Sequence, residues 1–314
     1  MNTLREQLLE ALEALRRTWG NESEALPSTL FSADMQYFSS HRGGAAGRPA
    51  ATTLIRGDFA GWEHVGIVVT NPVAKADDRL GVVAAYLLGE GSRAGNAIQF
   101  GGMIVMESER KDDSMRDSIR VTTVRIQINW VNGERFALAG WTLPTGQHWQ
   151  PGDPEATIVS EIDAPWHRVP ASSLAVTDEE AVAEAWYTYA WGLYMADNAL
   201  FGVCFTEDAS ALLPPMGDLQ GRRSLAGTLK AFRMPWPWIQ HYGVPLDIQV
   251  DREGEEASLV IGRLIPGQTR TPEGLPLFGA HYRIRAARVE GCWRIRRMEY
   301  HPGWVTAASG TAGT

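Results

Sequence analysis

The sequence predicts an α+β protein made of two tandem copies of one domain. Three observations lead to this prediction: short motifs return 174 residues downstream, each half opens with helical periodicity, and each half closes with runs of alternating residues. Helices followed by strands within one unit indicate helices packed on one face of a curved antiparallel sheet. A chain of 314 residues is long enough for two such domains.

Matched helix starts, turns and aromatic residues carry the repeat. Thr3-Leu4-Arg5-Glu6 and Thr177-Asp178-Glu179-Glu180 are both capping boxes, in which the Thr oxygen accepts from a free helix N–H and the Glu reaches back. The other pairs at this offset are Phe31 and Phe205, Asp34 and Asp208, Gly47-Arg48 and Gly221-Arg222, Trp62 and Trp236, and Trp130 and Trp304. Because the pairs keep one order along the chain, we interpret them as a duplication.

Each copy is predicted to begin with a long amphipathic helix. The stripe of the first copy is Leu4, Leu8, Leu12, Leu15 and Trp19, and that of the second is Trp186, Tyr189, Leu193 and Asp197. A second short helix is predicted to end at Asp34 in one copy and at Asp208 in the other. A Gly/Pro-rich stretch and another short helix follow in both copies.

The strands are predicted from β-branched residues, alternation and the turn residues between runs. They cover residues 66–74, 79–88, 97–109 and 118–131 in the first copy, and 244–251, 257–265, 278–289 and 293–300 in the second. The copies therefore span residues 1–142 and 174–306. Residues 143–173 form a Pro-rich linker without a helix, and the small, polar tail 307–314 is predicted to be disordered.

Composition and charge exclude several classes of protein. A net charge of −8 without a basic run argues against a nucleic-acid partner, and no apolar stretch approaches the roughly 20 residues of a membrane helix. The amphipathic N-terminus lacks the apolar core of a signal peptide, so we expect a cytoplasmic protein. Cys204 and Cys292 are expected to be buried as small hydrophobic residues, because two cysteines make neither a disulfide framework nor a metal site.

Four groups of residues have the spacing of a known family. The first group is Tyr194-Met195-Ala196-Asp197 followed by Phe205-Thr206-Glu207-Asp208, and the second is His241 followed by Ile248 and Asp251. The third is Tyr282 followed by Arg288 and Trp293-Arg294-Ile295. The fourth is Thr70-Asn71-Pro72-Val73, which stands 174 residues before Val244-Pro245-Leu246-Asp247. These segments resemble the SnoaL-like branch of the nuclear transport factor 2-like family, which contains scytalone dehydratase, bile-acid 7α-dehydratase and hexachlorocyclohexane dehydrochlorinase and is related to ketosteroid isomerase. The resemblance implies two tandem cone-shaped α+β barrel domains.

The resemblance also implies a catalytic dyad in the second copy. In dehydrating members a helix Asp orients a His, which moves a proton to or from the substrate; Asp197 and His241 match these positions. Tyr189 and Tyr194 are the candidates for the family's tyrosine, because Gly192 stands five residues before Asp197. Without the resemblance, an Asp near a helix end is typical of a cap, and a lone His before a strand is typical of a structural residue.

The first copy lacks this dyad, because Ser23 and Ile67 stand at the two positions. We therefore interpret it as a partner that helps to shape the second copy. Tyr37, His41 and His64 form a candidate second site, with ordinary loop polarity as the alternative.

Substrate-binding candidates in the second copy are Trp186, Trp236, Trp238, Arg222 and Tyr282. Trp236 and Trp238 stand in a proline-stiffened segment and suit either the wall of an apolar pocket or an interface between the copies. Arg222, like Arg48, follows a Gly in a turn. For both arginines the structural alternative is a guanidinium that binds backbone carbonyls or a neighbouring carboxylate.

The sequence holds no dinucleotide-binding glycine motif, phosphate loop, zinc spacing or nucleophile elbow, so we expect neither a cofactor nor a metal. The predicted function is a cofactor-independent dehydratase-like lyase or an isomerase. It would act by general acid/base catalysis on a hydrophobic aromatic or polycyclic small molecule, eliminating water, formaldehyde or a similar group. The alternatives are a non-catalytic binding or assembly protein, and an epoxide hydrolase or cyclase. The protein is expected to be a pseudo-dimeric monomer or a homo-oligomer.

Overall fold

The chain divides into two compact units, Met1–Ala175 and Val176–Thr314. The computed structural model describes residues 3–113, 116–134, 138, 140–143, 159–233 and 240–306. Within these ranges no helix is long and apolar enough to cross a membrane. The units are described one at a time.

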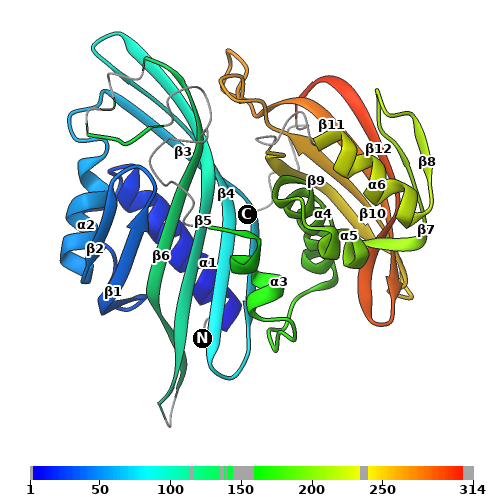
Figure 1. Cartoon of the computed structure of the whole chain (residues 1–314), viewed down its shortest axis with the longest axis horizontal. Coiled ribbons are helices and arrows are strands. Elements are labelled where there is room, and N and C mark those ends of the chain that lie inside the picture. Colours follow the sequence, from blue (N-terminus) through cyan, green and yellow to red (C-terminus); the bar gives the residue numbers. More distant parts are fainter. Residues whose placement is uncertain are drawn as a thin grey trace. The chain divides into compact units, whose positions relative to one another are not determined.

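The first unit consists of one long helix, three shorter helical segments and a curved sheet (Figure 1). Its elements are α1 (Leu4–Trp19), β1 (Phe31–Ser39), β2 (Gly43–Ala46), α2 (Arg48–Gly57), β3 (His64–Ala76), β4 (Leu80–Arg93), β5 (Asn96–Asp113), β6 (Arg116–Gly133), η2 (Glu161–Asp163) and α3 (Pro165–Arg168). The strand order in the sheet is β2-β1-β6-β5-β4-β3.

The second unit repeats this plan (Figure 1). Its elements are α4 (Asp178–Met195), α5 (Asn198–Cys204), β7 (Phe205–Leu212), β8 (Asp218–Gln220), α6 (Arg222–Arg233), β9 (Gly243–Val250), β10 (Glu256–Arg263), β11 (Leu277–Val289) and β12 (Cys292–Thr306). Its strand order, β8-β7-β12-β11-β10-β9, matches that of the first unit strand for strand. The prediction of two tandem α+β domains is therefore confirmed.

Both long helices begin at the predicted capping boxes. The Thr3 and Thr177 hydroxyls each accept a hydrogen bond at 3.2 Å from the backbone N–H three residues on. In α1 the predicted stripe is confirmed at Leu8, Leu12, Leu15 and Trp19, all of which are buried. This stripe packs the helix onto the concave side of the sheet, where apolar burial stabilises each unit.

The prediction of a short helix ending at Asp34 is wrong. Residues 31–39 form strand β1, and in the second unit α5 ends at Cys204, before strand β7. Strand β1 pairs in parallel with β6, and β7 pairs in parallel with β12, so both sheets are mixed and not purely antiparallel. The register shifts between Phe31 and Gln36, and this interrupts the alternation by which a strand is recognised in sequence.

The predicted linker is partly helical. Its described part, 159–173, contains η2 and α3, and α3 begins at Pro165, a residue suited to a first helical position. Ser173 N donates to Ala76 O at 2.7 Å, and Ala76 N donates to Ser172 Oγ at 3.2 Å. These bonds tie the segment to β3 of the first unit. The tail 307–314 lies outside the described residues.

The two cysteines lie in different surroundings. Cys204 is buried at the end of α5, as predicted, whereas Cys292 is exposed at the start of β12. The prediction for Cys292 is wrong because it follows the tight turn at Glu290 and Gly291, both of which have positive φ.

Gly243 allows β9 to approach α4 closely. A Cβ atom at this position would lie 2.1 Å from a ring carbon of Trp186, which is fully buried. An indole held on all sides cannot move away as a flexible surface side chain would. The absence of a side chain at residue 243 therefore fixes where β9 begins and where His241, two residues earlier, enters the unit.

We expect Gly243→Ala to destabilise the protein by about 1–3 kcal/mol, the usual cost of overpacking. The matched control is Gly227→Ala in α6, where a Cβ would meet nothing within 4 Å. That change should leave stability unchanged or raise it by up to about 1 kcal/mol, because Ala favours helix. Urea denaturation followed by circular dichroism measures both variants. Equal urea midpoints for the two variants would show that the Trp186 ring moves to make room for the added Cβ.

Candidate active site

The second unit holds a cavity of about 170 Å³ between α4, α6 and the sheet. Its polar lining consists of Tyr189, His241, Arg263, Tyr282 and Tyr300. Its apolar lining consists of Leu193, Leu213, Pro214, Met216, Leu229 and Phe232. Because a cavity of about 150 Å³ holds benzene, this volume suits a molecule with one ring.

Strand register brings three of the polar residues together. Tyr282 in β11 lies opposite Ile261 in β10 and opposite Tyr300 in β12. Arg263 is two residues beyond Ile261, so both side chains point to the same face of the sheet. Leu259 and Ile261 on that face are fully buried core residues. Arg263 therefore places a charge in a row that is otherwise apolar.

His241 lies within a triangle of rings. The ring centroids of Tyr189, His241 and Tyr282 are 6.2–6.4 Å apart. All three side chains are buried. The three predicted site residues Tyr189, His241 and Tyr282 are thus brought to one cavity.

Burial sets the charge state of these groups. It holds the pKa of His241 well below its ordinary value of 6.5, and the positive charge of Arg263 lowers that pKa further. Burial raises the pKa of Tyr189 well above 10.0 and raises the pKa of Tyr282 to about 12. At neutral pH the imidazole is therefore an uncharged proton acceptor, and the two phenols are hydrogen-bond donors.

Asp197 lies beyond the end of α4. The helix ends at Met195, and Ala196 takes the left-handed conformation with φ of 56°. Asp197 is the N-cap of α5, where its Oδ1 accepts from Ala199 N at 2.9 Å and from Leu200 N at 3.4 Å. It is not among the residues that line the cavity, and its pairing with His241 stays a prediction.

Tyr194 and Trp186 are buried but do not line the cavity. The Tyr194 backbone carbonyl accepts from Arg233 Nη2 at 2.8 Å. Trp186 packs against Tyr282, with ring centroids 5.7 Å apart, and so supports the cavity wall from behind.

Arg222 makes contacts of the structural kind. Its Nη1 donates to Gly202 O at 2.9 Å and its Nη2 donates to Glu207 Oε1 at 3.1 Å. Arg48, at the equivalent position of the first unit, donates to Phe31 O at 2.9 Å. Substrate binding by Arg222 stays a prediction, as does that by Trp236 and Trp238, which lie outside the described residues.

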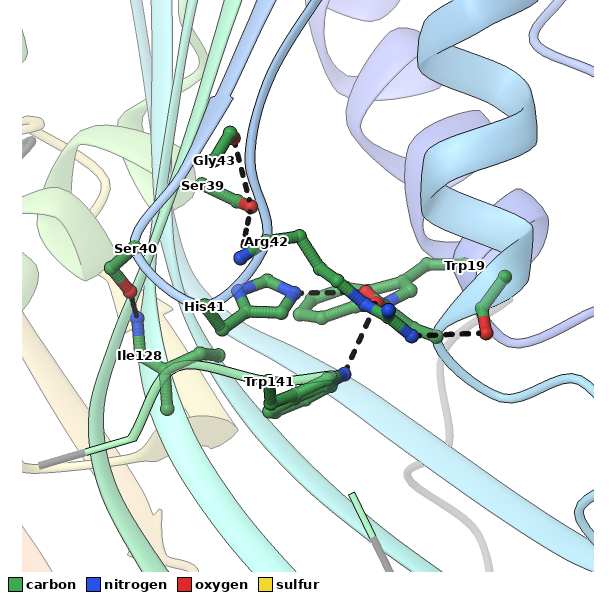
Figure 2. A network of polar contacts seen from close by, with 10 residues as sticks. Trp19, Ser39, Ser40, His41, Arg42, Gly43, Ile128 and Trp141 are labelled. Carbon is green, nitrogen blue, oxygen red and sulfur yellow. Dashed lines mark hydrogen bonds and ion pairs between the residues drawn. The ribbon is translucent and has the colours of Figure 1, made fainter. Parts of the chain in front are cut away.

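Asp58 is the acceptor of a polar network in the first unit, and Figure 2 labels its partners Trp19, His41, Arg42 and Trp141. Its Oδ2 accepts from Trp19 Nε1 at 2.8 Å and lies 2.8 Å from His41 Nε2. Its Oδ1 accepts from Arg42 Nε at 2.7 Å and from Trp141 Nε1 at 3.1 Å. Figure 2 shows the neighbouring residues His41 and Arg42 of the β1–β2 turn and Trp141 of a distant segment converging beside Trp19. His41 is thus fully enclosed.

The other two residues of the candidate second site lie in different places. Tyr37 is buried, and burial together with the charge of Asp58 raises its pKa. His64 is exposed at the start of β3, with its Nε2 4.0 Å from Glu90 Oε1. Tyr37 and His41 therefore lie in the protein interior, whereas His64 faces solvent.

The network fills the space that is a cavity in the second unit. Trp19 and Asp58 are 174 residues before Leu193 and Phe232, which line that cavity. The rings of Trp19, His41, Phe59, Phe100 and Trp141 pack with centroids 4.2–6.0 Å apart. Within the described residues, the cavity-lining positions Leu193 and Phe232 of the second unit therefore correspond to Trp19 and Asp58, two members of this packed network, in the first unit.

Sequence reasoning missed Arg263, Tyr300 and Asp58. Arg263 had a signal, since it ends the alternating row Leu259, Ile261, Arg263 on the inward face of a strand. Asp58 had none, because its donors are 16 to 83 residues away in the chain.

Residues 175–299, which make up most of the second unit, match the model of the SnoaL-like domain family. No curated protein matches the chain.

Solved structures similar to the chain each cover less than half of it. A protein from Kribbella flavida is 13% identical, covers 41% of this chain and 93% of its own, and has a TM-score of 0.36. A hexachlorocyclohexane dehydrochlorinase, LinA-type3 from Novosphingobium barchaimii LL02, is 14% identical over 46% of this chain and 92% of its own, with a TM-score of 0.36. A nuclear transport factor 2-like superfamily protein from Salmonella enterica serovar Typhimurium is 13% identical over 40% and 89%, with a TM-score of 0.32.

The buried neutral His241 makes stability depend on pH. Its pKa is depressed in the folded state, so as pH falls below 6.5 the unfolded chain takes up a proton that the folded chain does not. We expect the wild type to lose stability between pH 6.5 and 5 more steeply than His241→Gln, by at most about 1.4 kcal/mol per pH unit. Urea denaturation across this range measures the slopes. His64→Gln, which changes an exposed histidine, should keep the wild-type slope.

Asp58→Asn should destabilise the first unit by about 3–5 kcal/mol, because it removes the buried negative charge paired with Arg42 and replaces one of the two acceptor oxygens of the network with an NH2 donor. Asp34→Asn is the control, because Asp34 is an exposed residue of β1. This change should alter stability by less than about 0.5 kcal/mol. Thermal and urea denaturation compare the two variants. Equal stabilities would mean that the carboxyl group of Asp58 does not hold the network together.

Proposed function

We propose that the second unit is a lyase or isomerase that moves a proton from carbon with His241 as the base. The observation that supports this proposal is the neutral imidazole inside a ring-sized cavity, facing two phenol donors. A base is useful only when it is uncharged and next to the reacting atom. The match of residues 175–299 to the SnoaL-like family agrees with small-molecule chemistry, although the fold alone does not choose a reaction.

In this mechanism His241 removes a proton from a ring carbon of the substrate. The electron pair of the broken C–H bond forms a C=C bond as a leaving group departs, or becomes an enolate that is reprotonated at another carbon. Tyr189 and Tyr282 are placed to donate hydrogen bonds to the oxygen that gains charge. His241 then gives its proton to solvent or back to the product, so no cofactor enters the cycle.

The first test uses 5-nitrobenzisoxazole, a small probe that reports carbon deprotonation. Removal of its C–H proton forms a nitrile as the N–O bond breaks, and the phenolate product absorbs visible light. His241→Gln should lower kcat/KM by at least about a hundredfold, the usual contribution of a general base. His281→Gln in β11, a partly exposed residue outside the cavity, is the matched control. Equal rates for wild type and His241→Gln, or no rate above that of free imidazole, would reject the proposal.

Asp197→Asn separates a cap from a catalytic partner. Asn caps a helix about as well as Asp, so the α5 contacts survive while the charge is lost. Because Asp197 is not among the residues that line the cavity, we expect kcat/KM with the same probe to stay within a few-fold of wild type. A loss of about a hundredfold with unchanged urea stability would instead support the Asp197–His241 dyad.

A second candidate function is binding without turnover. It is favoured by the position of Asp197, because the acidic group expected to orient the imidazole is at the start of α5 and not on the cavity wall. Saturable binding of ring compounds by a protein that fails the elimination test would support this function.

A further inference from the structure

Arg263 brings an unmatched positive charge to the cavity. The five polar and six apolar residues that line the cavity include no Asp or Glu. Within the described parts of the chain, no ion pair or hydrogen bond joins the Arg263 side chain to another residue. A guanidinium keeps its charge in proteins, and a charge withdrawn from water without a partner is costly.

The position of Arg263 makes this charge a property of the cavity and not of the surface. The side chain is only partly exposed. Arg263 is the last residue of β10 and follows the buried Leu259 and Ile261 on the same face. Backbone pairing holds it there, because Arg263 pairs with Gly243 in β9 and with Ala280 in β11. The positive charge of Arg263 acts to lower the pKa of His241, Tyr189 and Tyr282.

We propose that the ligand of this cavity is a small one-ring compound with an anionic oxygen group, a carboxylate or a phenolate, that binds Arg263. The planar guanidinium matches a carboxylate with two parallel hydrogen bonds. The phenols of Tyr282 and Tyr300 offer additional donors beside it, and the apolar wall formed by Leu193 and Phe232 suits the ring. This deepens the proposed function by naming its substrate class.

The first test compares benzoate with benzamide, which has the same shape without the charge. Titration calorimetry on the full chain should give benzoate an affinity at least about tenfold higher than benzamide in the wild type. Arg263→Gln should abolish this preference, and Arg263→Lys should keep part of it. Arg285→Gln is the control, since Arg285 is an arginine of the same sheet that is exposed and lies outside the cavity.

The second test asks whether a phenolate is recognised in the same way. Bound 4-nitrophenol should ionise at a lower pH in the wild type than in Arg263→Gln, as read from the visible absorbance of its phenolate. A preference for benzoate alone identifies a carboxylate site, and a shift for nitrophenol alone identifies a phenolate site. No charge preference with either probe, or a preference that persists in Arg263→Gln, would overturn the proposal.

The outcome is separable from that of the proposed reaction. His241→Gln should retain the benzoate preference, because it removes the base and leaves the guanidinium. A wild type that binds benzoate through Arg263 but does not turn over 5-nitrobenzisoxazole would reject proton transfer and keep the anion site. Turnover that depends on His241, together with no preference for benzoate over benzamide, would keep proton transfer and reject the anion site.

Discussion

In each unit one curved sheet folds around one long helix. A polar group buried between the helix and the sheet needs a hydrogen-bonding partner. In the first unit one acceptor serves four such groups, since the Asp58 carboxyl group takes the side-chain contacts of Trp19, His41, Arg42 and Trp141. An unpaired polar group in such an interior costs more than a paired one contributes. The four donors and their acceptor are therefore one structural element, although they come from four segments of the chain.

The second unit leaves the same space open. Leu193 and Phe232 stand where the first unit has Trp19 and Asp58, and His241 and Tyr300 stand where it has Ile67 and Ile126. Bulky and charged groups in the first copy are exchanged for smaller or aromatic ones, while the aliphatic positions of its sheet are exchanged for polar ones.

Local patterns predicted most of the fold and little of the site. Capping boxes and stripes such as Leu8, Leu12 and Leu15 are set by neighbours in sequence, so the two long helices follow from them. Strand β1 did not follow, because the register shift after Phe31 breaks its alternation. The cavity depends on which residues strand pairing brings side by side, as with Tyr282 and Tyr300. Family spacing pointed to His241 and Tyr189, which line the cavity, whereas Asp58 required the three-dimensional contacts.

The charges in the cavity of the second unit form a consistent set. Burial and Arg263 both favour the uncharged imidazole of His241, which is the form that accepts a proton. Taking up that proton would place two positive charges in a small, mostly apolar space, at a cost that rises as the local dielectric falls. Negative charge on the bound molecule removes that cost and is itself stabilised by the guanidinium. A base kept neutral by a neighbouring cation is thus suited to a reaction in which the substrate becomes, or already is, an anion.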